Sequence, residues 1–190
     1  MLFRSVHGFA DLDENQRDYR IEHYDQMPPF FMNIVSDSDL WMFISSNGAL
    51  TAGRRDPDHA LFPYYTDDRI HDSHDITGSK TLLLVEKHGK TFLWQPLSRQ
   101  YENLYKTERV LYKNDISHQV TFREINLDLE LIFEYTWTSC DRYGFVKKSR
   151  IVNPAAEPAS IRILDGIQNI LPYGADQAFQ NQFSTLLDAY

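Results

Sequence analysis

Residues 45–75, with the sequence SSNGALTAGRRDPDHALFPYYTDDRIHDSHD, hold the densest group of side chains in this chain that could take part in chemistry. Three arginines, three histidines and six aspartates occur there, and Phe62, Tyr64 and Tyr65 interrupt the polar run. Carboxylates and imidazoles can act as acids, bases or metal ligands. The stretch is therefore either a functional site or a well-solvated loop.

The segment HDSHD at 71–75 offers His71 and His74 as nitrogen ligands, with Asp72 and Asp75 as oxygen ligands. On a helix this spacing could bind a metal ion. No helical periodicity surrounds the segment, so we expect a solvated loop and no metal. Cys140 is the only cysteine, and a lone thiol near a strand end usually serves packing rather than catalysis.

Other motifs of catalysis are missing from the sequence. It contains no glycine-rich phosphate loop, no nucleophile elbow and no paired-cysteine metal spacing. We therefore expect no catalytic residue and no cofactor in this chain.

Composition narrows the class of protein further. A chain of 190 residues can bury the core of one domain without requiring a second. Its net charge of −8 would repel phosphate backbones and anionic lipid headgroups, so we expect neither nucleic acid nor a membrane as a partner. A single cysteine allows no internal disulfide, the first residues show no secretory signal, and no run approaches about 20 apolar residues. We expect a cytoplasmic protein.

Hydrophobic periodicity predicts long strands with one solvent-exposed face. In LDLELIFEYTWTS (127–139), apolar residues alternate with Asp128, Glu130 and Glu134, which is the period of a strand. Residues 80–95 are typical of a hairpin that turns near His88 and Gly89. Further strands are predicted at 101–113, 117–126, 144–153 and 159–171. The tail differs, because Phe179, Phe183, Leu186, Leu187 and Tyr190 recur at helical spacing.

These elements predict a mainly β fold. Short connections favour antiparallel neighbours, and strands with one apolar face normally pack as two sheets around a shared core. The sequence therefore predicts an antiparallel two-sheet β-sandwich over residues 1–174, followed at 175–190 by an amphipathic helix or the start of a linker.

Aromatic residues make up 14% of the chain, and sheets that present aromatic rings beside polar side chains can bind sugars. Most of these rings, such as Phe133 and Trp137, fall on the apolar face of a predicted strand. We therefore expect them in the core.

Three phrases in the sequence resemble a known family. SSNGALTAGRRDPDHALFPYYTDDRIHD, CDRYGFVKKSRIVNPA and ILDGIQNILPYG are similar to the N-terminal region of cellobiose-phosphorylase-like proteins related to glycoside hydrolase family 94. The resemblance runs from about Phe31 to Tyr190 and is specific to a subgroup. It implies a galactose-mutarotase-like β-supersandwich. Such domains tend to be longer than 190 residues, so the resemblance also implies that the sheets of this chain could be incomplete.

The resemblance also implies that the chemistry lies elsewhere. In such enzymes the catalytic groups belong to a helical (α/α) toroid, which this sequence does not contain. The chain is then a non-catalytic domain of a glycoside phosphorylase or hydrolase, with the helical catalytic domain and an oligosaccharide as its partners. It would act as scaffold and interface, and unpaired sheet edges would favour a homo-oligomer.

Two hypotheses apply to the opening stretch. In the first, four residues face the domain junction and help form a sugar pocket: Arg54, Arg55, Asp58 and His59. In the second, which we favour, arginine–aspartate pairs hold a shaped loop to its own sheets. Gly48 and Gly53 would allow its unusual backbone, and Pro57 and Pro63 would fix its bends.

An alternative function is a free-standing sugar-binding or mutarotase-like module. A mutarotase needs an acid and a base directed at a sugar ring from one concave sheet. The candidates are His118 with Glu124 or Glu130, which lie in no recognisable motif.

Overall fold

The structure is a computed structural model that describes residues 8–13, 16–64 and 69–187, with side chains for 18–64 and 69–183. Its strands form three antiparallel sheets. The largest sheet has the order β1 (Gly8–Asp13), β2 (Gln16–Glu22), β8 (Thr107–Asn114), β9 (Gln119–Asn126), β10 (Leu131–Cys140) and β11 (Gly144–Val152). The second sheet has the order β12 (Ser160–Gln168), β6 (Gly78–Lys87) and β7 (Lys90–Trp94). The third has the order β3 (Phe31–Ile34), β4 (Leu40–Ser45) and β5 (Leu50–Arg54).

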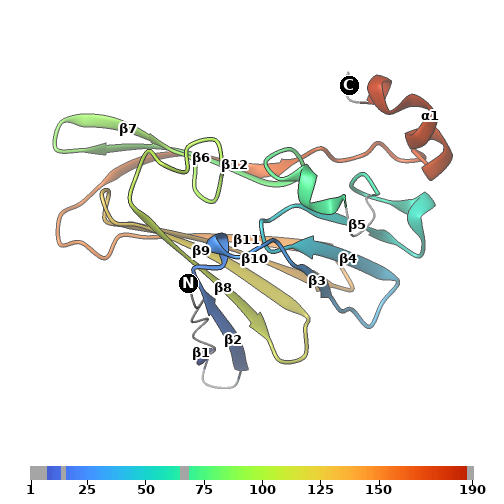
Figure 1. The fold of residues 1–190 in the computed structure, drawn as a ribbon, viewed down its shortest axis with the longest axis horizontal. Helices are drawn as coiled ribbons and strands as arrows, with labels where there is room; N and C mark the ends of the chain where they lie inside the picture. The colour runs from blue at the N-terminus through green and yellow to red at the C-terminus, as the bar shows by residue number, and fades with distance from the viewer. Residues whose placement is uncertain (1–7, 14–15, 65–68, 188–190) are drawn as a thin grey trace.

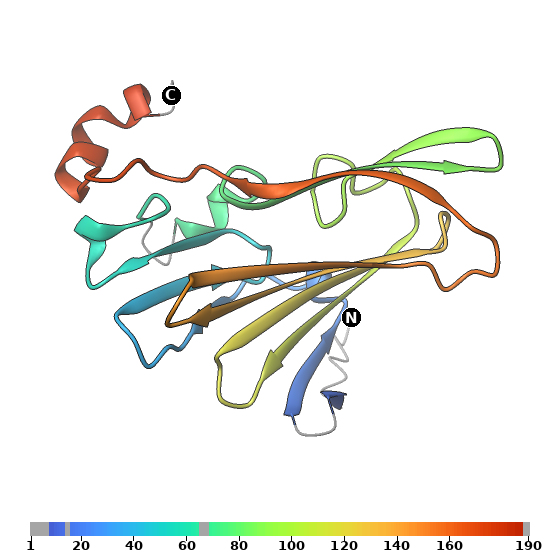
Figure 2. The same ribbon diagram turned by 180° about the vertical axis from the view of Figure 1, so that it is seen from behind.

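The three sheets make the predicted β-sandwich, with one layer divided in two. Figures 1 and 2 show the sheet of β12, β6 and β7 lying over the six-stranded sheet, with β3, β4 and β5 beside it. Both three-stranded sheets send side chains into one shared core with the six-stranded sheet. The mainly β fold and its C-terminal helix are thus confirmed, and the second layer consists of two separate sheets.

The core is rich in aromatic rings from β9 and β10. Phe122, Phe133 and Trp137 are almost fully buried, which confirms that the rings on this face serve packing. The Phe62 ring from the 45–75 stretch packs edge-on against Trp137, with centroids 6.4 Å apart. Part of that stretch is therefore anchored in the core.

Strand β10 follows the alternation that predicted it, but it is shorter. It begins at Leu131, because residues 127–130 form a turn in which Glu130 has a φ of 53°. The side chain of Asn126 accepts a hydrogen bond from the Leu129 amide at 2.9 Å, which holds this turn. Leu127 and Leu129 thus fit the alternating pattern of a strand, but they lie in the turn before β10.

The other predicted strands exist, with shifted ends. The 101–113 strand begins only at Thr107, and the 159–171 strand ends at Gln168, before Asn169 with its φ of 60°. The hairpin of β6 and β7 turns at His88 and Gly89, both with positive φ, as a tight hairpin turn requires.

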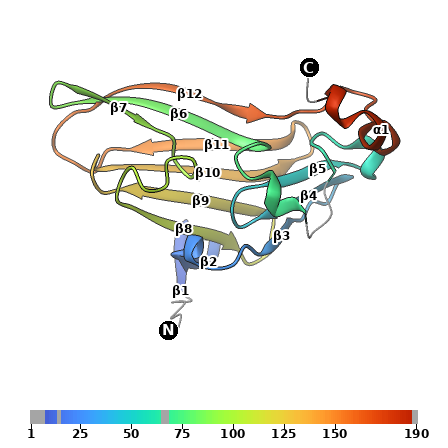
Figure 3. The ribbon, with the colours of Figure 1, turned by 45° about the horizontal axis from the view of Figure 1, so that its top comes forward.

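Helix α1 (Gln177–Leu187) confirms the predicted C-terminal helix. The Asp176 side chain accepts the Phe179 amide at 2.7 Å, which caps its first turn. Phe183 has non-helical backbone angles and interrupts the helix, while the side chains of Leu186 and Leu187 and the whole of Tyr190 lie outside the described parts. Figure 3 shows α1 at the end of the molecule where β5 also lies.

Within the residues that the structure describes, no helix has the length and apolar character needed to cross a membrane.

Candidate functional site

The two predicted arginines lie on the surface at the end of β5. Arg54 Nε is 3.3 Å and Arg55 Nε is 3.5 Å from the carboxylate of Asp39, which lies just before β4. Both guanidinium groups are largely exposed. The pairs join the two ends of the β4–β5 hairpin, which is the arrangement expected if the arginines hold the loop to its own sheet.

Asp58 and His59 lie in a short 3-10 helix, η2 (Pro57–His59), and each has a structural partner. Asp58 Oδ1 accepts the backbone amide of Gln177 at 3.1 Å, so it fastens the start of α1. His59 Nδ1 lies 2.6 Å from Asp56 Oδ1. The four predicted sugar-binding residues therefore share one outer corner of the molecule, and none of them lines either cavity described below.

The stretch that sequence analysis treated as a loop contains regular structure. Residues 50–54 form strand β5, which is buried except at Arg54 and has no alternation to reveal it. The HDSHD segment includes a 3-10 helix, η3 (Ile70–Ser73). Tyr65 lies outside the described residues.

The histidines of HDSHD do not converge on one point. His71 Nδ1 lies 2.7 Å from Ser45 Oγ, whereas His74 Nε2 lies 3.2 Å from Asp75 Oδ2. Across residues 8–13, 16–64 and 69–187, no group of three or more potential metal ligands occurs. The segment is not a solvated loop, however, because His74 is largely buried.

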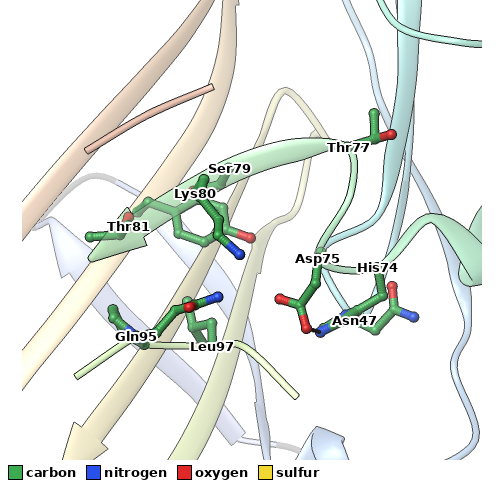
Figure 4. Close-up of a pocket in the computed structure, with 12 residues that line it drawn as sticks. Asn47, His74, Asp75, Thr77, Ser79, Lys80, Thr81, Gln95 and Leu97 are labelled. Atoms are coloured by element: carbon green, nitrogen blue, oxygen red, sulfur yellow. Dashed lines mark ion pairs between the residues drawn. The ribbon is translucent and has the colours of Figure 1, made fainter. Parts of the chain in front are cut away.

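A polar cavity lies where the three sheets meet, and we call it the junction crevice. It is bounded by the β4–β5 turn, by the segment between η3 and β6 together with the first part of β6, by the chain that follows β7, and by β10. The side chains that matter for its chemistry are Asn47, His74, Asp75, Thr81, Gln95 and Tyr135. Figure 4 shows Asp75 and His74 on one side of the gap and Gln95 and Thr81 on the other.

Glycine at position 48 allows the β4–β5 turn to lie close to Tyr135 at the wall of this crevice. Gly48 has a φ of +92°, which favours glycine, and a methyl group there would lie 2.9 Å from the Tyr135 hydroxyl. The sequence SNGAL therefore brings the β4–β5 turn close to β10.

The crevice carries a fixed negative charge at Asp75. Burial alone would raise the pKa of Asp75, but His74, the Arg99 amide at 2.9 Å and the Ser98 side chain outweigh it and lower that pKa to about 2. The carboxylate is therefore ionised throughout the physiological range. It can accept hydrogen bonds there.

A second cavity adjoins the first, because Asn47, His74 and Leu97 line both. It also contacts Tyr24 and Arg109. Each cavity has a volume of about 20 Å³, which is room for about one water-sized group.

Behind the second cavity, Glu124 is enclosed in a buried network. Its carboxylate accepts three hydrogen bonds, each of 2.8 Å, from Trp94 Nε1, the Leu97 amide and Arg109 Nε. Arg109 also donates to the carbonyl of Ser98 at 3.0 Å. A carboxylate with this many hydrogen-bond partners is held in one position, and we infer that it serves structure.

The alternative acid–base pairs are not brought together. His118 precedes β9 and contacts Asn114, while Glu124 lies near the other end of that strand. Six residues of extended chain separate them by roughly 20 Å. Glu130 pairs with Lys87 in the turn before β10.

Sequence reasoning missed most of the junction crevice. Its polar side chains come from four segments far apart in the chain, and each looks ordinary alone. The only available signal was the adjacent pair His74 and Asp75. Neither a family model nor a curated protein matches this chain.

Proposed function

We propose that this chain is a non-catalytic β-sandwich domain of a carbohydrate-active protein of the glycoside phosphorylase or hydrolase type. Its role is to support and to present an interface to a helical (α/α) catalytic domain. The observation that carries the proposal is an exposed apolar surface on β12 and its neighbours.

Strand β12 is an edge strand that exposes apolar side chains on both faces. Ile163 and Ile167 point to the six-stranded sheet and are 51% and 40% exposed, while Leu164 on the opposite face is 68% exposed. Leu84 and Leu93, on the face of Leu164, are also exposed. Large apolar side chains that are exposed together on an edge strand and its neighbours are typical of an interface.

The edge strands β11 and β12, which belong to different layers of the sandwich, differ in charge. The edge strand β11 carries Lys147, Lys148 and Arg150, and charged side chains protect an edge from pairing. Strand β12 carries one arginine and one aspartate, so its formal charges cancel. The apolar edge of β12 is therefore better suited to a protein partner than the charged edge of β11.

The ionisable groups inside the sandwich favour a supporting role. Glu124 is held by Arg109, Trp94 and Leu97, and Asp165 is held by Lys147 and Thr81. A group held in this way is poorly placed to transfer protons during a reaction.

The interface can be tested on the isolated chain by sedimentation velocity across a range of concentrations. With its partner domain removed, we expect the apolar surface of β12 to drive reversible self-association. Leu164→Lys should weaken this association at least about tenfold, because an ammonium group would have to be desolvated. Ile116→Lys is the matched control, since Ile116 is 67% exposed in the β8–β9 turn.

A chain that stays monomeric at every concentration would count against the interface. So would equal weakening by Leu164→Lys and Ile116→Lys, because the effect would then be one of net charge alone.

A further inference from the structure

The junction crevice contains buried polar atoms that the described protein leaves without partners. Gln95 is 5% exposed, and its Nε2 makes no hydrogen bond with any described residue. The Nδ1 atom of His74 has no partner there either. An unpaired buried donor costs free energy, so native proteins keep such groups mostly where water or a ligand completes them.

The acceptor that could complement Gln95 lies across the same gap. Figure 4 shows the side chains of Gln95 and Asp75 reaching into the gap from opposite sides. Asp75 is held in place by the Arg99 amide on its carboxylate and by Gln168 Nε2, which donates to its backbone carbonyl at 2.7 Å. The crevice thus offers a free donor on one wall and a fixed acceptor on the other.

The size of the crevice limits what can enter. Its volume of about 20 Å³ exceeds the roughly 10–15 Å³ needed for one water molecule. A sugar ring is far larger, but a single hydroxyl or hydroxymethyl arm matches this space. The rest of a ligand would lie outside the crevice, whose lining also includes Lys80.

Local topology explains why the crevice opens here. Strand β7 pairs with β6 only from Leu83 to Lys87, and after Trp94 the chain turns inward toward Glu124. The first part of β6, from Gly78 to Leu82, therefore has β12 on one side and the crevice on the other.

We propose that the junction crevice binds one hydroxyl or hydroxymethyl group of a polyol or sugar, which accepts a hydrogen bond from Gln95 Nε2 and donates one to Asp75. A hydroxyl can do both, because it is a donor and an acceptor at once. The choice of a sugar as the source of this group rests on the proposed function. The hydroxyl chemistry rests on the crevice alone.

The first test is titration of the ¹⁵N-labelled chain with glycerol and, separately, with D-glucose, followed by NMR. We expect the side-chain amide of Gln95 and the backbone amides of Asp75 and Thr81 to shift. Gln95→Leu should weaken binding at least about tenfold, since the donor is lost. Gln177→Leu, an exposed glutamine on α1, should leave the affinity unchanged.

The thermal stability of Gln95→Leu gives a second readout that a merely structural glutamine would not produce. Removing an unpaired buried amide should raise the Tm of the ligand-free chain by about 2–4 °C. A glutamine that stabilises the fold through its amide would instead lower the Tm when replaced.

Shifts with glycerol alone support a polyol as the ligand, and shifts with glucose support a sugar. The proposal is overturned if neither ligand shifts these resonances, if Gln95→Leu keeps the wild-type affinity, or if its Tm falls. None of these results would change self-association through β12. The proposed function can therefore still hold if the junction crevice binds no hydroxyl group.

Discussion

The adjacent residues His74 and Asp75 show how one side chain can be misjudged from sequence. In the printed sequence they end a run of polar residues, which is typical of a solvated loop. In the structure His74 is buried beside a carboxylate that also receives the Arg99 amide. No local pattern signals that burial, because the covering residues come from distant strands.

The lowered pKa of Asp75 predicts an acid-sensitive contribution to stability. Its pKa is about 2 in the folded chain and about 3.8 in the unfolded chain. The unfolded chain therefore binds more protons between these values, and the stabilisation present above pH ~4 is lost as the pH falls toward ~2. Because Asp75 is partly exposed, solvent screening limits the effect to about 1 kcal/mol.

Urea denaturation at pH 7 and near pH 3 can measure this contribution. We expect Asp75→Asn to lower the free energy of unfolding at pH 7 by about 1 kcal/mol and by less near pH 3. Asp37→Asn, at an exposed aspartate, serves as the control. An equal loss at both pH values would show that Asp75 acts through packing rather than through its charge.

The strands that alternate could be predicted, and those buried on both faces could not. Strands β9 and β10 show alternation because one face meets the core and the other is partly exposed. Strand β5 has four consecutive buried residues, and β4 is nearly as enclosed, so neither has a polar face to mark it. The segment SNGALTAGR (46–54) covers the turn after β4 and the whole of β5, although its sequence predicts a shaped loop.

Within β5, Gly53 is needed for space rather than for an unusual backbone. A methyl group at this position would lie 2.6 Å from Trp41 Cζ2 and 2.7 Å from both the Ala60 Cα and the His59 carbonyl oxygen. Two of these atoms belong to the backbone and cannot move aside easily. Only glycine lets β5 lie this close to the segment at Ala60, with which Gly53 forms a β-bridge.

We therefore expect Gly53→Ala to lower the free energy of unfolding by about 2–3 kcal/mol in urea denaturation, because the η2 segment must be displaced. Gly166→Ala is the matched control in a strand, since no heavy atom lies within 4 Å of its added methyl group. That control should change stability by less than about 1 kcal/mol. A harmless Gly53→Ala would mean that the η2 segment is not packed on β5 as the structure has it.

At the scale of the whole molecule, the sandwich separates its surfaces by role. The 45–75 stretch fastens α1 and the β4–β5 hairpin, the junction crevice lies between the sheets, and β12 presents an apolar edge. Periodicity predicted the layers. It could not predict the crevice, because that site depends on how the two smaller sheets sit on the larger one.

The most direct test of a supporting role is polarimetry of freshly dissolved α-D-glucose with and without the isolated chain. We expect the optical rotation to relax at the rate of the buffer alone, because the candidate acid and base residues among those that the structure describes, His118 with Glu124 or Glu130, have separate partners and do not converge on one site. A rate that rises in proportion to chain concentration and is lost in His74→Ala or His118→Ala would contradict the account. It would establish the mutarotase-like alternative instead.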